Sequence, residues 1–152
     1  HAKVGDEVEL RGGSGGFHFE PEWHGPLVLI AGGIGITPLI SILRYVDQSH
    51  LENPVELIYS ASQPSELLFR EEIQAIADRN TGIRCAFTVS RPQGGDWDGR
   101  GGRIDLELLR EHAPTEDSLY YLCGPPSFQD DLSVLVSNLG VKASMIRAER
   151  WW

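Results

Sequence analysis

The sequence predicts an α/β domain whose five parallel strands form one sheet with helices on both faces. Three observations predict it: five short apolar segments recur along the chain, stretches with helical spacing separate them, and residues 27–31 are a continuous apolar run. Such a run is typical of a strand buried on both faces, as in parallel sheets. A chain of 152 residues is long enough for one such domain with a substantial core.

The first strand and helix have the clearest pattern. Residues 27–31 predict the strand, and glycines follow it directly. Thr37 suits the capping position of a helix and Pro38 the first helical position. We therefore expect a helix that Thr37 caps, with apolar residues at helical spacing: Leu39, Ile40, Leu43 and Val46.

The remaining elements follow from apolar patterns and from glycine, proline and asparagine punctuation. The predicted strands are residues 55–59, 83–89, 119–123 and 143–149, and the predicted helices are residues 65–79, 105–112 and 125–138. Ligands of such sheets bind beyond the carboxyl ends of the strands, where the strand order reverses. That rule directs attention to the loops after the first and fourth strands.

The first 25 residues do not belong to this alternation. Residues 4–10 alternate polar and apolar side chains and predict one more strand, and the glycine-rich residues 12–16 predict a turn or linker. We interpret residues 1–25 as the C-terminal strand of a preceding domain with its connection. Residues 26–152 then form the α/β domain.

Composition excludes several kinds of partner. The formal net charge of -9 argues against nucleic acid and anionic membrane surfaces as partners. The sequence has no run of 18 apolar residues, so no membrane span is expected. Cys85 and Cys123 are too few and too far apart for a disulfide framework, a zinc site or an iron–sulfur cluster. The histidines lack ligand spacing, so no metal site is expected, and the sparse cysteines favour an intracellular, reducing compartment.

Residues 32–38, Gly-Gly-Ile-Gly-Ile-Thr-Pro, are the first candidate site. Glycines between a buried strand and a helix let a ligand approach the backbone, and the positive helix end favours a pyrophosphate. The segment is neither the G-x-G-x-x-G pattern nor a P-loop. A tight turn without a ligand is the alternative.

Residues 123–126, Cys-Gly-Pro-Pro, are the second candidate site, at the end of the fourth strand. A glycine and two prolines give a rigid turn with little backbone freedom. A buried structural cysteine beside a stiff turn is the alternative interpretation.

Taken together, four segments resemble the pyridine-nucleotide domain of ferredoxin–NADP reductases. They are Ala-Gly-Gly-Ile-Gly-Ile-Thr-Pro at 31–38, Leu-Leu-Phe-Arg-Glu-Glu at 67–72, Thr-Val-Ser-Arg at 88–91 and Cys-Gly-Pro-Pro at 123–126. Gly-Asp-Glu-Val at 5–8 with Gly16 and Phe17 resembles the end of that superfamily's flavin-binding barrel. The ending Glu-Arg-Trp-Trp resembles the oxidoreductase NAD-binding domain-containing protein 1 group in particular. The resemblance covers essentially the whole chain.

The resemblance implies a Rossmann-like domain that meets a flavin domain, with hydride passing between nicotinamide and FAD at their interface. It implies that Thr37 lies near the nicotinamide, that Cys123 packs on its reactive face and that Glu149 orients it. These three are the candidate catalytic residues. The implied cofactor-binding residues are Gly32, Gly33, Ile34, Gly35, Ile36, Thr37, Pro38, Ser90, Arg91, Cys123, Gly124, Pro125, Pro126, Trp151 and Trp152, with the two tryptophans covering the flavin.

Ser90 and Arg91 follow the third predicted strand, where the resemblance places the adenosine ribose. An arginine fork suits a phosphate, which favours NADP. Relatives that use NADH also carry Ser-Arg-Pro here, and Pro92 follows in this chain. No acidic residue, which would indicate NAD, stands at this place. NAD and NADP both stay open, with a slight preference for NAD from the group resembled, and a solvated Arg91 is the alternative.

The function expected is that of a reductase domain passing electrons from NADH or NADPH to FAD and on to an unknown acceptor. The superfamily's flavin motifs are absent from the chain, so FAD is expected upstream and the isolated chain is expected to be inactive. A non-catalytic nucleotide-binding or redox-sensing module and a purely structural domain are the alternatives. The resemblance also allows a mitochondrial location, with any targeting segment upstream of His1.

Overall fold

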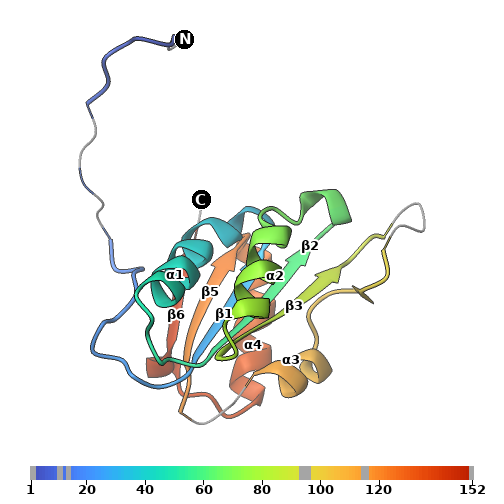
Figure 1. The fold of residues 1–152 in the computed structure, drawn as a ribbon. Coiled ribbons are helices and arrows are strands. Elements are labelled where there is room, and N and C mark those ends of the chain that lie inside the picture. The colour runs from blue at the N-terminus through green and yellow to red at the C-terminus, as the bar shows by residue number, and fades with distance from the viewer. Residues whose placement is uncertain (1–2, 10–11, 13–14, 93–96, 114–116, 151–152) are drawn as a thin grey trace.

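A computed structural model describes residues 3–9, 12, 15–92, 97–113 and 117–150 (Figure 1). Its strands and helices, with 3-10 helices written η, are β1 (Leu27–Gly32), η1 (Gly33–Gly35), α1 (Ile36–Gln48), β2 (Val55–Ala61), η2 (Pro64–Glu66), α2 (Arg70–Arg79), β3 (Ile83–Val89), β4 (Arg100–Gly101), α3 (Leu106–His112), β5 (Leu119–Gly124), α4 (Pro126–Asn138), η3 (Ala143–Met145) and β6 (Ile146–Arg150).

The strands form one parallel sheet in the order β4-β3-β2-β1-β5-β6. This confirms the predicted α/β class, although the sheet has six strands where five were expected. The extra strand, β4, pairs only Arg100 and Gly101 with Thr88 and Val89. Two residues in a glycine-rich loop carry no apolar period, so the sequence pattern could not predict β4.

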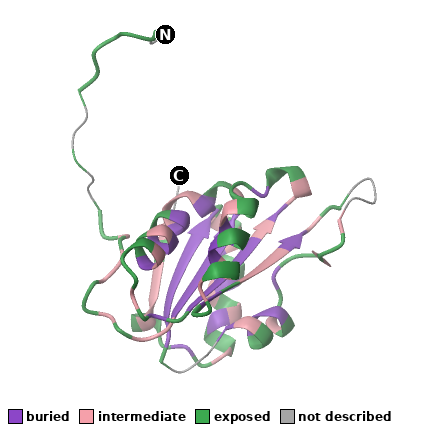
Figure 2. Ribbon diagram, in the orientation of Figure 1, coloured by how far each residue is buried: buried purple, intermediate pink, exposed green. Residues whose placement is uncertain are grey.

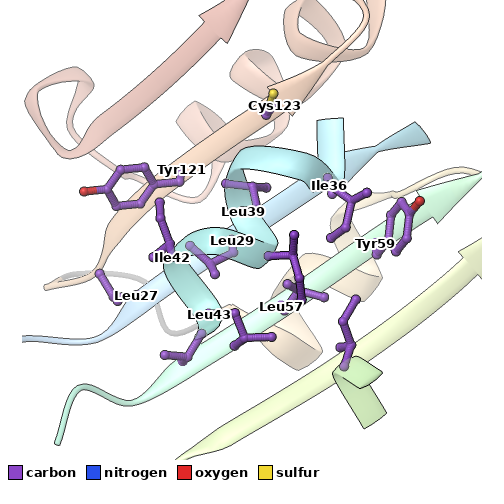
Figure 3. Packing of buried hydrophobic residues seen from close by; sticks show 14 of the residues in the cluster. Leu27, Leu29, Ile36, Leu39, Ile42, Leu43, Leu57, Tyr59, Tyr121 and Cys123 are labelled. Carbon is purple, nitrogen blue, oxygen red and sulfur yellow. The ribbon is translucent and has the colours of Figure 1, made fainter. Parts of the chain in front are cut away.

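Helices cover both faces of the sheet, and an apolar cluster lies between the sheet and the helices on each face. On one face α1 and α2 pack on residues such as Leu29 and Leu57, and on the other α3 and α4 pack on Val28 and Ile30. Figure 2 shows the central strands buried along their length, and Figure 3 shows α1 side chains interlocking with Leu29 and Leu57. All six residues of β1 are buried, as its apolar run predicts.

The first helix begins earlier than expected. Gly35 occupies its capping position and Thr37 is its second residue, so the prediction that Thr37 caps it is wrong. The Thr37 hydroxyl instead donates a hydrogen bond to the carbonyl oxygen of Ile34 at 3.1 Å. Because η1 leads directly into α1, the helix needs no side-chain cap at this end.

The predicted helix over residues 65–79 is divided in two. Residues 64–66 form η2, Phe69 has a left-handed backbone with φ of 59°, and α2 starts at Arg70. The buried Tyr59 hydroxyl donates to the carbonyl of Glu66 and accepts from the amide of Leu68, at 3.1 and 3.2 Å. These bonds satisfy backbone groups that a continuous helix would pair internally.

Both chain ends differ from their predictions. Residues 143–145 form η3, so the last strand, β6, starts at Ile146 rather than at residue 143. Of residues 4–10, expected in a strand, the described residues 4–9 are not in one; Val4 and Val8 are exposed. Alternation alone does not make a strand, because a strand is stable only with a hydrogen-bonded neighbour. Leu10 lies outside the described residues.

The segment before β1 packs on the α/β domain. The Phe17 ring meets the Tyr121 ring edge-on at 5.5 Å, and the Tyr121 hydroxyl donates to the carbonyl of His18. The Asn53 side chain donates to the carbonyls of Trp23 and Gly25, both at 2.9 Å. No helix of the described chain has the length and apolar character needed to cross a bilayer.

Candidate functional site

The strand order reverses between β1 and β5, and both candidate sites lie at that point. β1 pairs with β2 on one side and with β5 on the other. Ala31 is the register partner of Cys123, so the segments that follow β1 and β5 leave the sheet side by side. The fold thus brings residues 32–38 and 123–126 together at the carboxyl edge, as the switch-point rule predicts.

Gly35 joins the two segments by close backbone contact. A methyl group on Gly35 would lie 2.2 Å from the carbonyl oxygen of Cys123, so only glycine fits. Gly33 has a φ of +54°, a left-handed conformation that glycine adopts without strain. The glycines therefore shape the turn and its contact with β5, in addition to opening the backbone to a ligand.

Phe128, on α4, covers the start of both segments. A methyl group on Gly32 would come within 2.9 Å of the Phe128 ring, and one on Gly124 within 2.6 Å. The sequence analysis missed Phe128. Its position three residues after Pro125 was the available signal, because a residue in the first turn of α4 faces the same edge of the sheet.

A cavity of about 470 Å³ lies beside this point, over the carboxyl ends of β1, β2 and β3. Its volume falls in the range of small-ligand sites. Five predicted residues line it: Gly32, Gly33, Ser90, Arg91 and Pro125. The lining residues that the sequence analysis did not single out are Ser60, Ala61, Ser62, Glu66, Arg103, Ile104, Ser127, Phe128, Asp131, Leu132 and Leu135.

The cavity lining combines polar and apolar residues. Backbone bonds from the amides of Ser90 and Arg91 to the carbonyls of Ala61 and Ser62, at 3.0 and 2.9 Å, fix the loops that follow β2 and β3. Ile104 and Leu132 are among the apolar lining residues.

The helix N-termini at this edge favour an anion. α1 and α4 both begin here, and neither has an acidic residue in its first turn, whereas α2 and α3 do. The partial positive charge of the two helix ends is therefore not cancelled locally. Arg91 and Arg103 also line the cavity, and the Arg103 guanidinium lies 3.4 Å from the Asp131 carboxylate.

Cys123 and Glu149 are register partners at the ends of the adjacent strands β5 and β6. Register partners in a parallel sheet point to the same face, and Cys123 belongs to the cluster packed under α1 (Figure 3). Cys123 is fully buried and Glu149 half-buried. Neither residue lines the cavity. Cys123 and Glu149 therefore lie next to each other, at a place separate from Ser90 and Arg91.

Gln129 holds the ends of β5 and β6 together. Its side-chain amide is buried and donates to the carbonyls of Gly124, at 2.9 Å, and of Glu149. The sequence analysis missed Gln129. A buried polar side chain at the end of the first turn of α4 gives no signal in a single sequence, because its role depends on β6 returning beside β5.

The other predicted residues have distinct places. Ile36 is fully buried in the core, so only its backbone can face a ligand, whereas Ile34 is 53% exposed. Pro38 is half-buried within α1, and Pro126 starts α4. Trp151 and Trp152 lie outside the described residues.

The chain matches the oxidoreductase NAD-binding domain family over residues 29–133. It is 36% identical to oxidoreductase NAD-binding domain-containing protein 1 of Danio rerio, over 98% of this chain and 61% of that protein. It is 30% identical to NADH-cytochrome b5 reductase 1 of Aspergillus terreus, over 91% of this chain and 49% of that protein. The chain thus spans about half the length of the curated relatives it matches.

Solved structures give the same picture of the fold. The FAD/NAD-binding domain of nitric oxide dioxygenase from Vibrio cholerae superposes with a TM-score of 0.79 at 28% identity, over 90% of this chain and 55% of that chain. The cytochrome b5 reductase domain of Ulva prolifera nitrate reductase has a TM-score of 0.76 at 23% identity, over 86% and 50%. The latter similarity concerns the fold alone.

Proposed function

Because this chain belongs to the oxidoreductase NAD-binding domain family, we propose that it holds the nicotinamide dinucleotide of a flavin-dependent reductase. The dinucleotide lies across the carboxyl edge of the sheet, and FAD is carried by a second domain. The bound nicotinamide supplies a hydride to the flavin, which passes electrons to a separate acceptor. The observation that carries the proposal is the cavity at which Gly33, Ser90, Arg91 and Pro125 meet.

The residues of the cavity fit the adenosine and pyrophosphate. Ile104 and Leu132 would pack against the adenine, and Ser90 and Arg91 would bind the ribose. The pyrophosphate crosses Gly33 between the N-termini of α1 and α4, where amide groups and helix dipoles favour it. Side chains larger than glycine would obstruct this path.

The nicotinamide end then passes Pro125 toward the face that bears Thr37, Cys123 and Glu149. Cys123 is fully buried, so its small, polarisable thiol would meet a planar ring only after the side chains that cover it move aside. Glu149 accepts a hydrogen bond and so biases the position of the ring. These residues align the ring and exchange no proton with it in the transfer step.

Calorimetry on the chain, with NAD+, NADP+ and AMP as ligands, tests the adenosine site. We expect weak but measurable binding of AMP and of at least one dinucleotide, since the chain holds the adenosine half alone. Arg91→Glu should weaken AMP binding about fivefold or more, because it places a carboxylate beside the ligand's charge.

Arg110→Glu is the matched control, because Arg110 is exposed on α3 and does not line the cavity. It should leave binding unchanged. No heat from any of the three ligands at millimolar concentration would count against the proposed function. Equal weakening by both substitutions would mean that net charge, and not the cavity, governs binding.

A further inference from the structure

We infer that Glu66 makes the site selective for NAD over NADP, by accepting hydrogen bonds from the adenosine ribose and repelling a 2′-phosphate. The inference rests on the proposed function, since it assumes that the cavity holds the adenosine half. It names a residue outside the segments on which the resemblance to reductases was based. No acidic residue stands beside Ser90 in the sequence, but the fold brings one to the cavity.

Glu66 reaches the cavity because β2 is followed by a turn. Residues 64–66 form η2, which carries Glu66 back to the end of β2, where it lines the cavity with Ser60 and Ser62. β2 lies next to β1, whose glycines begin the pyrophosphate path. In dinucleotide-binding sheets of related design, an acidic residue near this strand end bonds the ribose hydroxyls of NAD.

Hydrogen bonds position Glu66, and the Leu68 amide donates one of them to its carbonyl at 2.9 Å. Its amide donates to the carbonyl of Gln63 at 3.0 Å, and its carbonyl accepts from the Tyr59 hydroxyl at 3.1 Å. Its carboxylate oxygen Oε2 accepts from the amide of Ser62 at 3.1 Å. Tyr59 is fully buried, so the backbone of the turn is tied to the core, while the Glu66 side chain is exposed and the Ser62 amide orients its carboxylate.

Burial also keeps Tyr59 in the form that this arrangement needs. A tyrosine phenol is protonated near neutral pH at its ordinary pKa, and burial raises the pKa of the Tyr59 phenol further, so the hydroxyl donates to the Glu66 carbonyl. Rigid placement matters for selectivity, because a flexible carboxylate would move aside for a phosphate at little cost.

The charges that line the cavity are balanced. Glu66 and Asp131 supply two carboxylates, and Arg91 and Arg103 supply two guanidinium groups. The Arg103 group is already near Asp131. A 2′-phosphate beside Ser90 therefore meets Arg91 and Glu66 together, and the repulsion by Glu66 offsets the attraction by Arg91. A ribose with free hydroxyls meets no such repulsion and gains an acceptor.

Glu66→Gln tests the inference, because it removes the charge and keeps an amide oxygen for the bond with Ser62. The chain and the variant are titrated with NAD+ and with NADP+ by calorimetry. We expect the unmodified chain to bind NAD+ more tightly. In the variant, the ratio of the two dissociation constants should shift about tenfold toward NADP+.

Glu71→Gln is the matched control: the same substitution five residues later, at an exposed position on α2 that does not line the cavity. It should leave the ratio unchanged. Thermal unfolding of both variants shows whether the turn has kept its structure, and a destabilised Glu66→Gln chain is replaced in the titration by Glu66→Ser.

The outcomes separate the two proposals. Suppose that the unmodified chain binds nucleotides, but that Glu66→Gln and Glu71→Gln give the same ratio of the dissociation constants for NAD+ and NADP+. Glu66 then only stabilises its turn, and the inference is overturned. Tighter binding of NADP+ than of NAD+ by the unmodified chain would also overturn it. A chain that binds neither nucleotide would overturn the proposed function together with the inference.

Discussion

At the scale of the residue, two groups of side chains serve the two ends of the proposed ligand. Ser90, Arg91 and Glu66 line the cavity at β2 and β3, and Cys123 with Glu149 marks the ends of β5 and β6. Backbone contact at Gly33 and Gly35 lies between them. This separation means that the ring end and the adenosine end can be perturbed independently.

Cys123→Ala and Glu149→Gln should each slow flavin reduction in the full-length protein. Loss of alignment predicts a decrease between about tenfold and a thousandfold, while AMP binding stays nearly unchanged. Stopped-flow reduction by NADH or NADPH measures it. Cys85→Ala is the control for the thiol, because Cys85 lies within β3 and away from this edge. Rates equal to those of the unmodified protein would make Cys123 and Glu149 structural.

At the scale of the element, the turns between strands and helices determine which residues reach the cavity and the carboxyl edge of the sheet. The glycines of η1 let α1 begin against β5, and the Tyr59 hydroxyl interrupts the expected long helix so that η2 carries Glu66 to the cavity. Gln129 on α4 ties β5 to β6. In each case a few hydrogen bonds or close contacts fix where a strand end meets a helix start.

Gly35→Ala should disturb the junction of η1 with β5. The added methyl group would overlap the Cys123 carbonyl, and relief of that overlap should lower the free energy of unfolding by about 1–3 kcal/mol. Chemical denaturation measures the loss, and AMP affinity should fall as well. At Gly101 a methyl group meets nothing within 4 Å, so Gly101→Ala is the control. Equal effects of the two substitutions would contradict the proposed close contact.

Asp105 caps α3 by accepting from the amide of Leu108 at 2.9 Å, and it pairs with Arg100. Asp105→Ala should cost about 1 kcal/mol at pH 7, and Asp105→Asn, which keeps an acceptor, clearly less. The Leu108 bond lowers the pKa of Asp105 in the folded chain.

A lowered folded pKa fixes the pH dependence of this contribution. The stabilisation by the carboxylate is fully present above the ordinary aspartate pKa and is lost as the pH falls through the lowered one. The difference between unmodified chain and Asp105→Ala in urea unfolding should therefore shrink below about pH 4. A difference that is the same at pH 7 and at pH 3 would exclude the carboxylate as its source.

At the scale of the whole molecule, the chain is one nucleotide domain with a packed N-terminal segment. Phe17 meets Tyr121, and Arg147 on β6 pairs with Glu20, so residues ahead of β1 are part of the folded unit. The match to the oxidoreductase NAD-binding domain family confirms the resemblance drawn from the four segments. The chain covers 49% and 61% of two of the curated relatives it matches.

The chain of residues 1–152 on its own should bind no FAD and show no NADH-dependent dye reduction. The flavin-binding segments typical of the superfamily are absent from its sequence. Gel filtration after incubation with FAD, followed by a visible spectrum, measures this, and AMP binding by the same sample shows that it is folded. Flavin absorbance that elutes with the protein would contradict the prediction.

The sequence by itself determined the parallel α/β class and the two segments at the switch point, because both depend on local patterns. An apolar run predicts a doubly buried strand, and glycines between strand and helix predict an anion-binding turn. The resemblance named Cys123 and Glu149 together, and the register of β5 with β6 places them side by side.

Only the tertiary structure decided which other side chains meet at the site. Glu66 comes from a turn that a hydroxyl on β2 holds, Arg103 and Asp131 approach from different elements, and Gln129 acts across β5 and β6. The extra strand β4 and the early start of α1 are likewise set by neighbours in space. Contacts between residues distant in the chain leave no periodicity in a single sequence, so their partners appear only when the sheet has formed.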